Sequence, residues 1–151
     1  MSELKKIIDD ITAFGVHPKV TMTTKHEHLK KLLVRMYSEF LNLNQPEADD
    51  TDYGETPDFD YEEIRKNVVS NFPELGWYGT VIEMENIDEK PTLIGDAVDD
   101  LADIIKDLLA VKWRFENTSE ADAIWYFNFL MYAHTEQHLV DLLKYLKYKF
   151  G

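Results

Sequence analysis

The sequence predicts an all-α fold, a single-domain bundle of about five helices with long acidic loops and little or no strand. Two observations favour this fold, and a third limits its chemistry. The chain has 151 residues, the length of one ordinary domain, and its 44% hydrophobic and 13% aromatic content is enough to build a core. Apolar residues recur at helical spacing along most of the chain. Cysteine is absent, so disulfides and thiolate metal sites are excluded.

The first two helices are predicted from apolar residues that share one face. A short amphipathic helix should run from Ser2 to about Phe14, because glycine and proline follow it. The second begins at the capping-box pattern of Thr24 and Glu27, a hydroxyl followed three residues later by a carboxylate. It should continue to about Leu43.

Residues 44–60 interrupt the helical pattern. This segment has seven carboxylates and no basic residue, and it is long for a loop inside a compact domain. Like-charge repulsion should keep it extended and mobile. Its carboxylates are candidates for binding a basic partner, and the ones that we single out are Asp49, Asp50, Asp52, Glu55 and Asp58.

The middle of the chain predicts a third helix and one possible strand. Asp60 and Glu63 have the pattern of a helix start, and Pro73 should end the helix. A short strand is plausible only at residues 75–81, and a second irregular acidic segment follows at 83–89.

Two neighbouring aromatic residues, Trp77 and Tyr78, lie between glycines in this stretch. Aromatic side chains of this kind can anchor an interface, so both are candidates for partner binding. Packing on the core or its edge is the simpler explanation.

The fourth helix should open at Asp96, run to about Glu116, and carry an apolar stripe that already includes Ile94. It also has aspartates at the spacing with which helical nucleotide pyrophosphohydrolases bind divalent metal. A helical wheel with about 100° per residue places four of them on a solvated face opposite the core and the fifth, Asp100, at the border. These five are Asp96, Asp99, Asp100, Asp103 and Asp107. The pyrophosphohydrolases also need an upstream glutamate cluster, and this chain has Arg65 in that place, which disfavours that class of enzyme.

The fifth and longest helix should begin after Ser119 and run unbroken to about Lys149, with no glycine or proline inside it. Residues 123–133 are apolar nearly all round. This half of the helix should therefore be central and the most buried.

His134 and His138 are spaced i, i+4 within the apolar stripe of that helix. Metal ligands on helices often have this spacing, and Asp100, His26 or His28 could supply a third ligand. A pair of core histidines, each hydrogen-bonded to a carboxylate or a carbonyl, is the simpler explanation.

The net charge of −13 limits the partners. Nucleic acid and anionic membranes both require a basic footprint, so neither is expected. A basic protein, a divalent cation or plain solubility are compatible with the charge. No apolar run is long enough to span a bilayer and the first residues lack a signal sequence, so we expect a cytoplasmic protein. Motifs for nucleophilic catalysis and for phosphate-binding loops are also missing.

Several segments of the last two helices carry a family resemblance. They are residues 95–104, 111–114, 122–125 and 134–142, and the earlier segments 32–43 and 60–65 fit the same layout. In these segments the chain resembles an uncharacterised bacterial family, domain of unknown function 5063, over about residues 24–150. It departs from the family inside 134–138, where an aromatic residue and a glycine are expected. The resemblance implies an all-helical fold and an intracellular bacterial protein, but no activity and no functional residue.

The first functional hypothesis is a non-enzymatic acidic interaction module without a cofactor. Inhibitors and immunity proteins against basic toxins are often small, acidic and free of cysteine, so this role is its concrete form. The alternative is a metal-dependent hydrolase or metal-binding helical bundle that uses His134, His138 and Asp100, with a divalent metal as cofactor. A homodimer through the aromatic helix is a third hypothesis.

Overall fold

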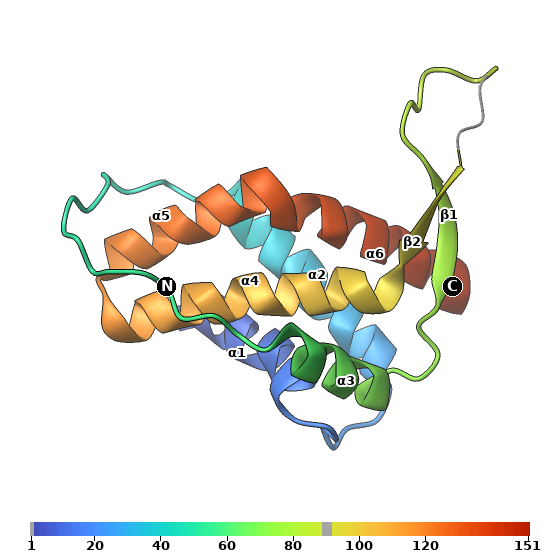
Figure 1. Cartoon of the computed structure of the whole chain (residues 1–151), viewed down its shortest axis with the longest axis horizontal. Coiled ribbons are helices and arrows are strands. Elements are labelled where there is room, and N and C mark those ends of the chain that lie inside the picture. The colour runs from blue at the N-terminus through green and yellow to red at the C-terminus, as the bar shows by residue number, and fades with distance from the viewer. Residues whose placement is uncertain (1, 89–91) are drawn as a thin grey trace.

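Two antiparallel helical rods set the long axis of the molecule (Figure 1). The computed structural model describes residues 2–88 and 92–151. In chain order its helices are α1 (Ser2–Val16), α2 (Lys25–Leu41), α3 (Tyr61–Asn71), α4 (Ala97–Asn117), α5 (Glu120–Leu130), the π-helical turn η1 (Met131–Thr135) and α6 (Glu136–Phe150). One rod is α4 and the other is α5, η1 and α6 in succession. Counting the second rod as one helix, the described residues form the predicted bundle of five helices, so the predicted fold class is confirmed.

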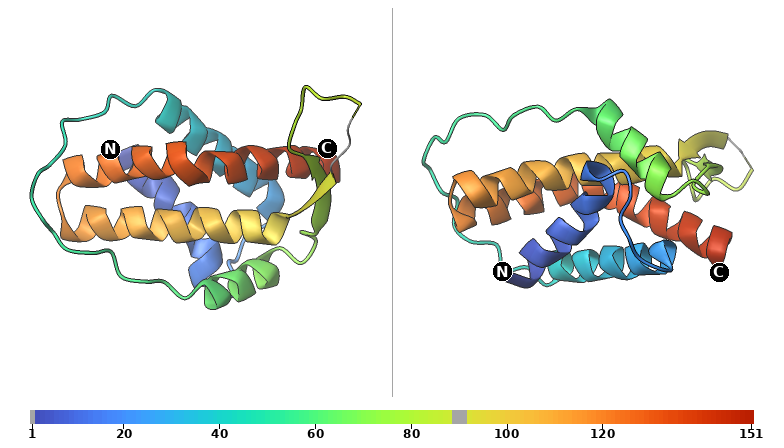
Figure 2. Two further views of the ribbon diagram at one scale, coloured as in Figure 1. Left: turned by 45° about the horizontal axis from the view of Figure 1, so that its top comes forward. Right: turned by 90° about the horizontal axis from the view of Figure 1, so that it is seen from below.

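Helix α4 is central to the packing. It contacts α1, α3, α5 and α6, while α2 packs against α1 and α6. The second view shows α1 and α2 together on one side of the two rods (Figure 2). The residues buried between these layers include Phe14, Leu33, Leu101, Phe127 and Leu139. None of the described helices combines the length and the apolar character that a bilayer-spanning segment needs.

Three of the predicted helix starts have the expected cap. The side chains of Asp60, Asp96 and Ser119 accept hydrogen bonds from the first-turn backbone N–H groups of α3, α4 and α5. The capping box predicted for α2 is wrong. Thr24 lies in the left-handed region with φ of 51° and its side chain makes no capping bond, so α2 begins at the predicted place without that interaction.

A two-stranded hairpin precedes α4 and was only half predicted. Strand β1 (Trp77–Val81) was expected, but β2 (Thr92–Asp96) was not. The strands are antiparallel, with Tyr78 opposite Gly95. Ile94 therefore belongs to β2 and is 76% exposed, rather than part of the apolar stripe of α4. The hairpin lies at the end of the molecule where α4 begins and α6 ends (Figure 1).

The acidic segment 44–60 is extended, as predicted, and follows the outside of the bundle around α5 and along α4 to α3 (Figure 1). It is attached at several points. Asp49 accepts a hydrogen bond from Ser119, Gln45 bonds to Asn128 at 3.1 Å, and Phe59 packs against the core. Its mobility remains a prediction.

The expectation that the first half of the last rod is the most buried is wrong. Trp125, Phe129 and Tyr132 are 38%, 49% and 83% exposed. Helix α4 covers one side of α5, but Trp125 and Phe129 of α5 and Tyr132 of η1 lie at the surface. Trp125 and Phe129 stack there with their ring centroids 5.6 Å apart.

Candidate metal centre

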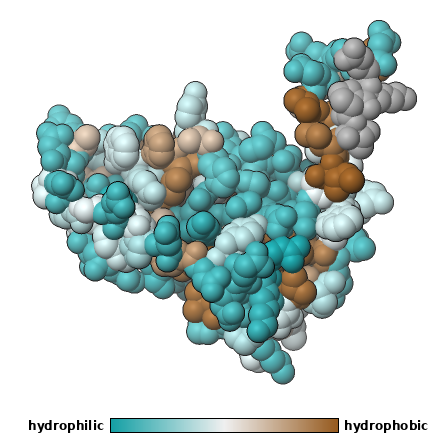
Figure 3. Space-filling model, in the orientation of Figure 1, coloured by the Kyte–Doolittle hydropathy of each residue, from teal (hydrophilic) through white to brown (hydrophobic). Residues whose placement is uncertain are grey.

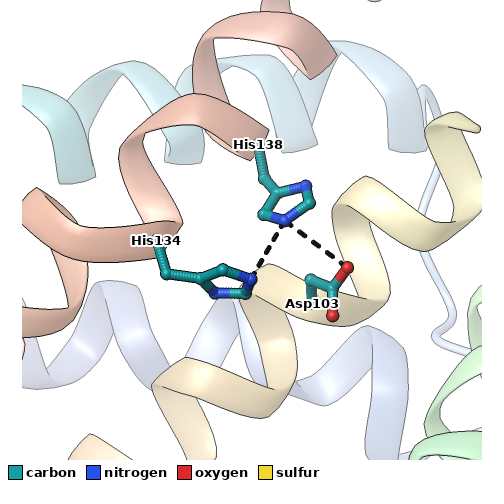
Figure 4. Close-up of side chains that lie close together, drawn as sticks. All are labelled: Asp103, His134 and His138. Atoms are coloured by element: carbon teal, nitrogen blue, oxygen red, sulfur yellow. Dashed lines mark hydrogen bonds and ion pairs between the residues drawn. The ribbon is translucent and has the colours of Figure 1, made fainter. Parts of the chain in front are cut away.

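The turn η1 interrupts the second rod at the two histidines. The backbone N–H of Glu136 donates to the carbonyl of Met131, the i to i+5 bond that defines a π turn. Met131 and Thr135 are buried, so they fix this turn in the bundle. His134 and His138 both point toward α4, where Asp103 lies (Figure 4). Single π turns inside α-helices occur frequently at functional sites.

Each histidine has a carboxylate on its Nδ1 side. His134 Nδ1 lies 2.7 Å from Asp107 Oδ2, and His138 Nδ1 lies 2.8 Å from Asp100 Oδ1. An ionised carboxylate accepts hydrogen bonds but cannot donate them, so each imidazole must donate its Nδ1–H. Because Nδ1 carries the proton, the Nε2 atom of each neutral ring carries a lone pair.

Both carboxylates are oriented by a hydroxyl group. Thr135 Oγ1 donates to Asp107 Oδ2 at 2.7 Å, and Tyr78 Oη donates to Asp100 Oδ2 at 2.5 Å. Asp100 is only 5% exposed. The two imidazoles are therefore held by hydroxyl–carboxylate–imidazole chains on both sides.

The Nε2 atoms face each other. They are 3.2 Å apart, and Asp103 Oδ2 lies 3.5 Å from His138 Nε2. Two lone pairs and a carboxylate oxygen at this separation repel one another unless a cation lies between them. That cation is either a shared proton or a metal ion.

The spacing of the three atoms fits a metal ion. Asp103, His134 and His138 each offer one ligand atom within 4.8 Å of the others. Ligands placed about 2.0–2.1 Å from a tetrahedral zinc ion are about 3.3 Å apart, close to the two distances above. A metal-binding histidine usually donates the N–H of its other ring nitrogen to a carboxylate, as both histidines do here.

The electrostatics of the centre favour a positive charge. The hydrogen bond to Asp100 raises the pKa of His138, and the charge of Asp103 acts in the same direction. Burial raises the pKa of Asp103, an effect that the two histidines oppose. The side chains of His134, His138 and Asp103 are 47%, 24% and 28% exposed, so solvent reaches the centre.

The structure changes the roles expected of the aspartates. Asp100, expected as the third ligand, lies on the Nδ1 side of His138, away from His134. Asp103, expected on a solvated face, is the third member of the centre. The helical wheel divided α4 into one core face and one solvated face. In the structure η1 and α6 also pack against α4, so Asp103 faces them and not open solvent.

The first turn of α4 is not a bare solvated face either. Arg65 donates to Asp99 at 2.9 Å and to Asp96 at 3.1 Å, and Tyr61 donates to Asp99 at 3.0 Å. The single positive charge of Arg65 thus partly neutralises Asp96 and Asp99, which lie outside the centre. His26, another possible ligand, stacks on Phe150 instead.

The candidates for partner binding differ in accessibility. Trp77 is 75% exposed on the hairpin, whereas Tyr78 points inward to Asp100, as alternation along a strand requires. In the loop, Asp49 is tied down by hydrogen bonds with Ser119 and Tyr53. The other four candidate carboxylates are exposed, and they are Asp50, Asp52, Glu55 and Asp58.

Sequence reasoning missed Thr135. It named Asp107 and Tyr78 but gave them other roles, a solvated helix face for Asp107 and partner binding for Tyr78. The position of Asp107 could have been inferred from the sequence. Helices joined by a short turn run antiparallel, so residues at similar distances from the turn lie side by side. The aspartates before Ser119 and the histidines after it meet this condition. Tyr78 depends on the hairpin register, which no pattern in the sequence indicated.

Comparison with known proteins supports the fold alone. No protein-family model and no curated protein matches the chain. The chain is similar to a solved structure, the crystal structure of protein BF1032 from Bacteroides fragilis, a structural-genomics target. The TM-score is 0.75 at 21% identity, and the match covers 97% of this chain and 89% of that one. The resemblance to domain of unknown function 5063 stays a prediction.

Proposed function

We propose that this protein binds a divalent transition-metal ion through His134, His138 and Asp103. One observation carries the proposal. The two imidazole Nε2 atoms lie 3.2 Å apart, while each Nδ1 is hydrogen-bonded to a carboxylate. A metal ion would replace the repulsion between these lone pairs by two coordinate bonds.

The donor set indicates which metals fit. Imidazole nitrogens suit zinc, copper, iron and nickel, whereas magnesium and calcium prefer all-oxygen sites. Three protein ligands would leave a coordination position open to solvent, as in catalytic zinc sites, where the bound water becomes a nucleophile. This supports a metal-dependent hydrolase over a purely structural site. A magnesium cluster of the pyrophosphohydrolase type is not supported, because Arg65 lies against the aspartates that would complete it.

A basic protein partner is our second proposal. Its support is that Asp50, Asp52, Glu55 and Asp58 are exposed and that no ion pair engages them within the described residues. Such a surface would increase the rate of association with a basic protein. An inhibitor or immunity-type role and a cytoplasmic location belong to the same proposal.

The metal proposal is tested by titrating Zn²⁺ into chelator-treated protein by isothermal calorimetry. We expect one zinc per chain and a higher melting temperature, because an ion that binds the native state stabilises it. His134→Gln, His138→Gln and Asp103→Asn should each weaken zinc binding by at least about a hundredfold, because losing a ligand costs more than the loss of about 10- to 100-fold caused by altering an outer-shell group.

Two matched variants control for adventitious zinc on an acidic surface. Asp99→Asn removes a neighbouring carboxylate of α4, and His28→Gln removes a histidine of α2. Neither should alter the affinity. Equal loss in control and site variants, or no zinc binding at all, would overturn the proposal.

A further inference from the structure

We propose that Tyr78 is a positioning residue of the metal centre that couples the centre to the β1–β2 hairpin. This inference rests on the proposed function, since it concerns the control of the same site. Tyr78 would fix the orientation of His138 through Asp100, and a metal bound to His138 would in return fix the hairpin.

The contact is built into the hairpin register. Tyr78 lies opposite Gly95, and a Cβ atom at Gly95 would come within 2.3 Å of the Tyr78 ring. Only glycine leaves room for the ring to cross β2. The Tyr78 hydroxyl passes beyond the hairpin in this way and reaches Asp100 in the first turn of α4.

A continuous hydrogen-bonded chain then runs from the hairpin to the centre. Tyr78 donates to Asp100 Oδ2, whose other oxygen accepts from His138 Nδ1, and His138 Nε2 faces His134. Because Asp100 is buried, water cannot easily replace the tyrosine hydroxyl if it is removed. Burial and the bond to Asp100 also raise the pKa of Tyr78, so its hydroxyl stays protonated as a donor.

The coupling has a consequence for the hairpin surface. The hairpin exposes several large apolar side chains within the described residues, namely Trp77, Ile82, Met84, Ile87, Leu93 and Ile94. Figure 3 shows hydrophobic residues, in brown, on the part of the hairpin that projects from the bundle. Coupling between two sites is reciprocal. A metal that orders His138 should therefore order the strand that presents this surface.

The molecule offers a matched control for Tyr78. Tyr145 of α6 also ties the hairpin down, because its hydroxyl accepts a hydrogen bond from Gly76 N–H at 2.9 Å. Its ring packs against that of Tyr78 with centroids 5.7 Å apart. The Tyr145 hydroxyl also donates to the Glu74 carbonyl at 3.4 Å, so both of its bonds go to the connection that leads into β1. Its loss therefore affects hairpin docking without altering the metal ligands.

The experiment compares Tyr78→Phe with Tyr145→Phe. Zinc affinity is measured by calorimetry, and backbone hydrogen exchange of residues 77–81 is measured with and without Zn²⁺. Zinc should slow exchange of the hairpin in the wild type. Tyr78→Phe should weaken zinc binding about tenfold, as for altered second-shell groups, and abolish the zinc-dependent protection. Tyr145→Phe should speed exchange in both states while leaving zinc affinity unchanged.

Gly95→Ala gives a second route to the same result, because the added Cβ displaces the Tyr78 ring without changing any hydrogen-bonding group. It should reproduce the loss of zinc affinity. If the wild type binds zinc and Tyr78→Phe binds it equally well, the inference is overturned and the proposed function stands. Equal weakening in Tyr78→Phe and Tyr145→Phe would also overturn it, since the effect would then reflect hairpin docking alone. Absence of zinc binding in the wild type would overturn the proposed function itself.

Discussion

Asp100 and Asp103 lie three residues apart on α4 but have different surroundings. Asp100 is buried and receives hydrogen bonds from both Tyr78 and His138, so its two oxygens are fully engaged. Asp103 is partly exposed, and its Oδ2 lies 3.5 Å from His138 Nε2. A buried carboxylate with both oxygens occupied can orient a ligand, whereas a half-exposed one is free to bind the ion itself.

Asp49 permits a pH test of the loop attachment. Hydrogen bonds from Ser119, Tyr53 and the Thr51 backbone lower the pKa of Asp49 below its usual value. Its folded pKa is thus below its unfolded pKa of about 3.9. The carboxylate therefore contributes stability that is fully present above about pH 4 and is lost as the pH falls toward the folded value.

Asp49→Asn should accordingly lower the melting temperature near neutral pH, and this effect should become smaller in acid. Thermal melts of both proteins at about pH 7 and about pH 3 would show the difference shrinking. Asp50→Asn, which changes an exposed neighbour, should not lower the melting temperature at either pH. A difference between Asp49→Asn and the wild type that does not depend on pH would contradict the expectation.

At the scale of single residues, the sequence predicted the histidine pair with Asp100 beside it, but not the positions of Asp103 and Asp107 next to the two rings. The i, i+4 spacing placed His134 and His138 on one helix face, and this needed only local geometry. The choice between Asp100 and Asp103 depended on how α6 lies against α4, which a wheel drawn for one helix does not contain. Tyr78 was placed correctly in a strand, while its inward direction followed from the register with Gly95.

At the scale of elements, local signals predicted the helices well and their irregularities poorly. Periodic apolar residues and the caps at Asp60, Asp96 and Ser119 are local, so these helix starts were found. Strand β2 is short and half of it resembles the start of an apolar helical stripe, so it was missed. The π turn has no pattern of its own in the sequence, because tertiary packing of Met131 and Thr135 holds it.

The π turn can be tested by deleting Ala133, an exposed residue within it. The deletion removes the extra residue of the turn and allows regular α-helical hydrogen bonds through the segment. The buried residues of α6 can then keep their positions, so helix content and melting temperature should be retained. His134 would rotate away from Asp107, and zinc affinity should fall at least tenfold, by about the loss typical of a disturbed second shell.

Circular dichroism and calorimetry would follow these two quantities. Tyr132→Ala is the matched control, because it alters an exposed residue of the same turn without changing its length. Zinc binding by the deletion variant at wild-type affinity would show that the turn does not set the geometry of the centre.

At the scale of the whole molecule, the charge is unevenly distributed. The net charge is −13, yet the aspartates of α4 are engaged with Arg65, Tyr61 and the histidines. The loop 44–60 keeps most of its carboxylates exposed. Repulsion between like charges lowers the free energy of unfolding of a protein with a high net charge. The exposed carboxylates of the loop should therefore account for a measurable part of this destabilisation.

Replacing Asp50, Asp52, Glu55 and Asp58 together by their amides should raise the melting temperature at low ionic strength. The gain should fade as salt is added, because the screening length decreases to about 10 Å at 0.1 M and to about 3 Å at 1 M. Neutralising the exposed Lys19 and Lys31 should lower the melting temperature, since it makes the net charge more negative. Thermal melts in a series of salt concentrations would measure both effects. If the loop variant melts at the wild-type temperature at every salt concentration, the carboxylates do not strain the fold. Their charge is then compatible with the compact state without any basic partner to neutralise it.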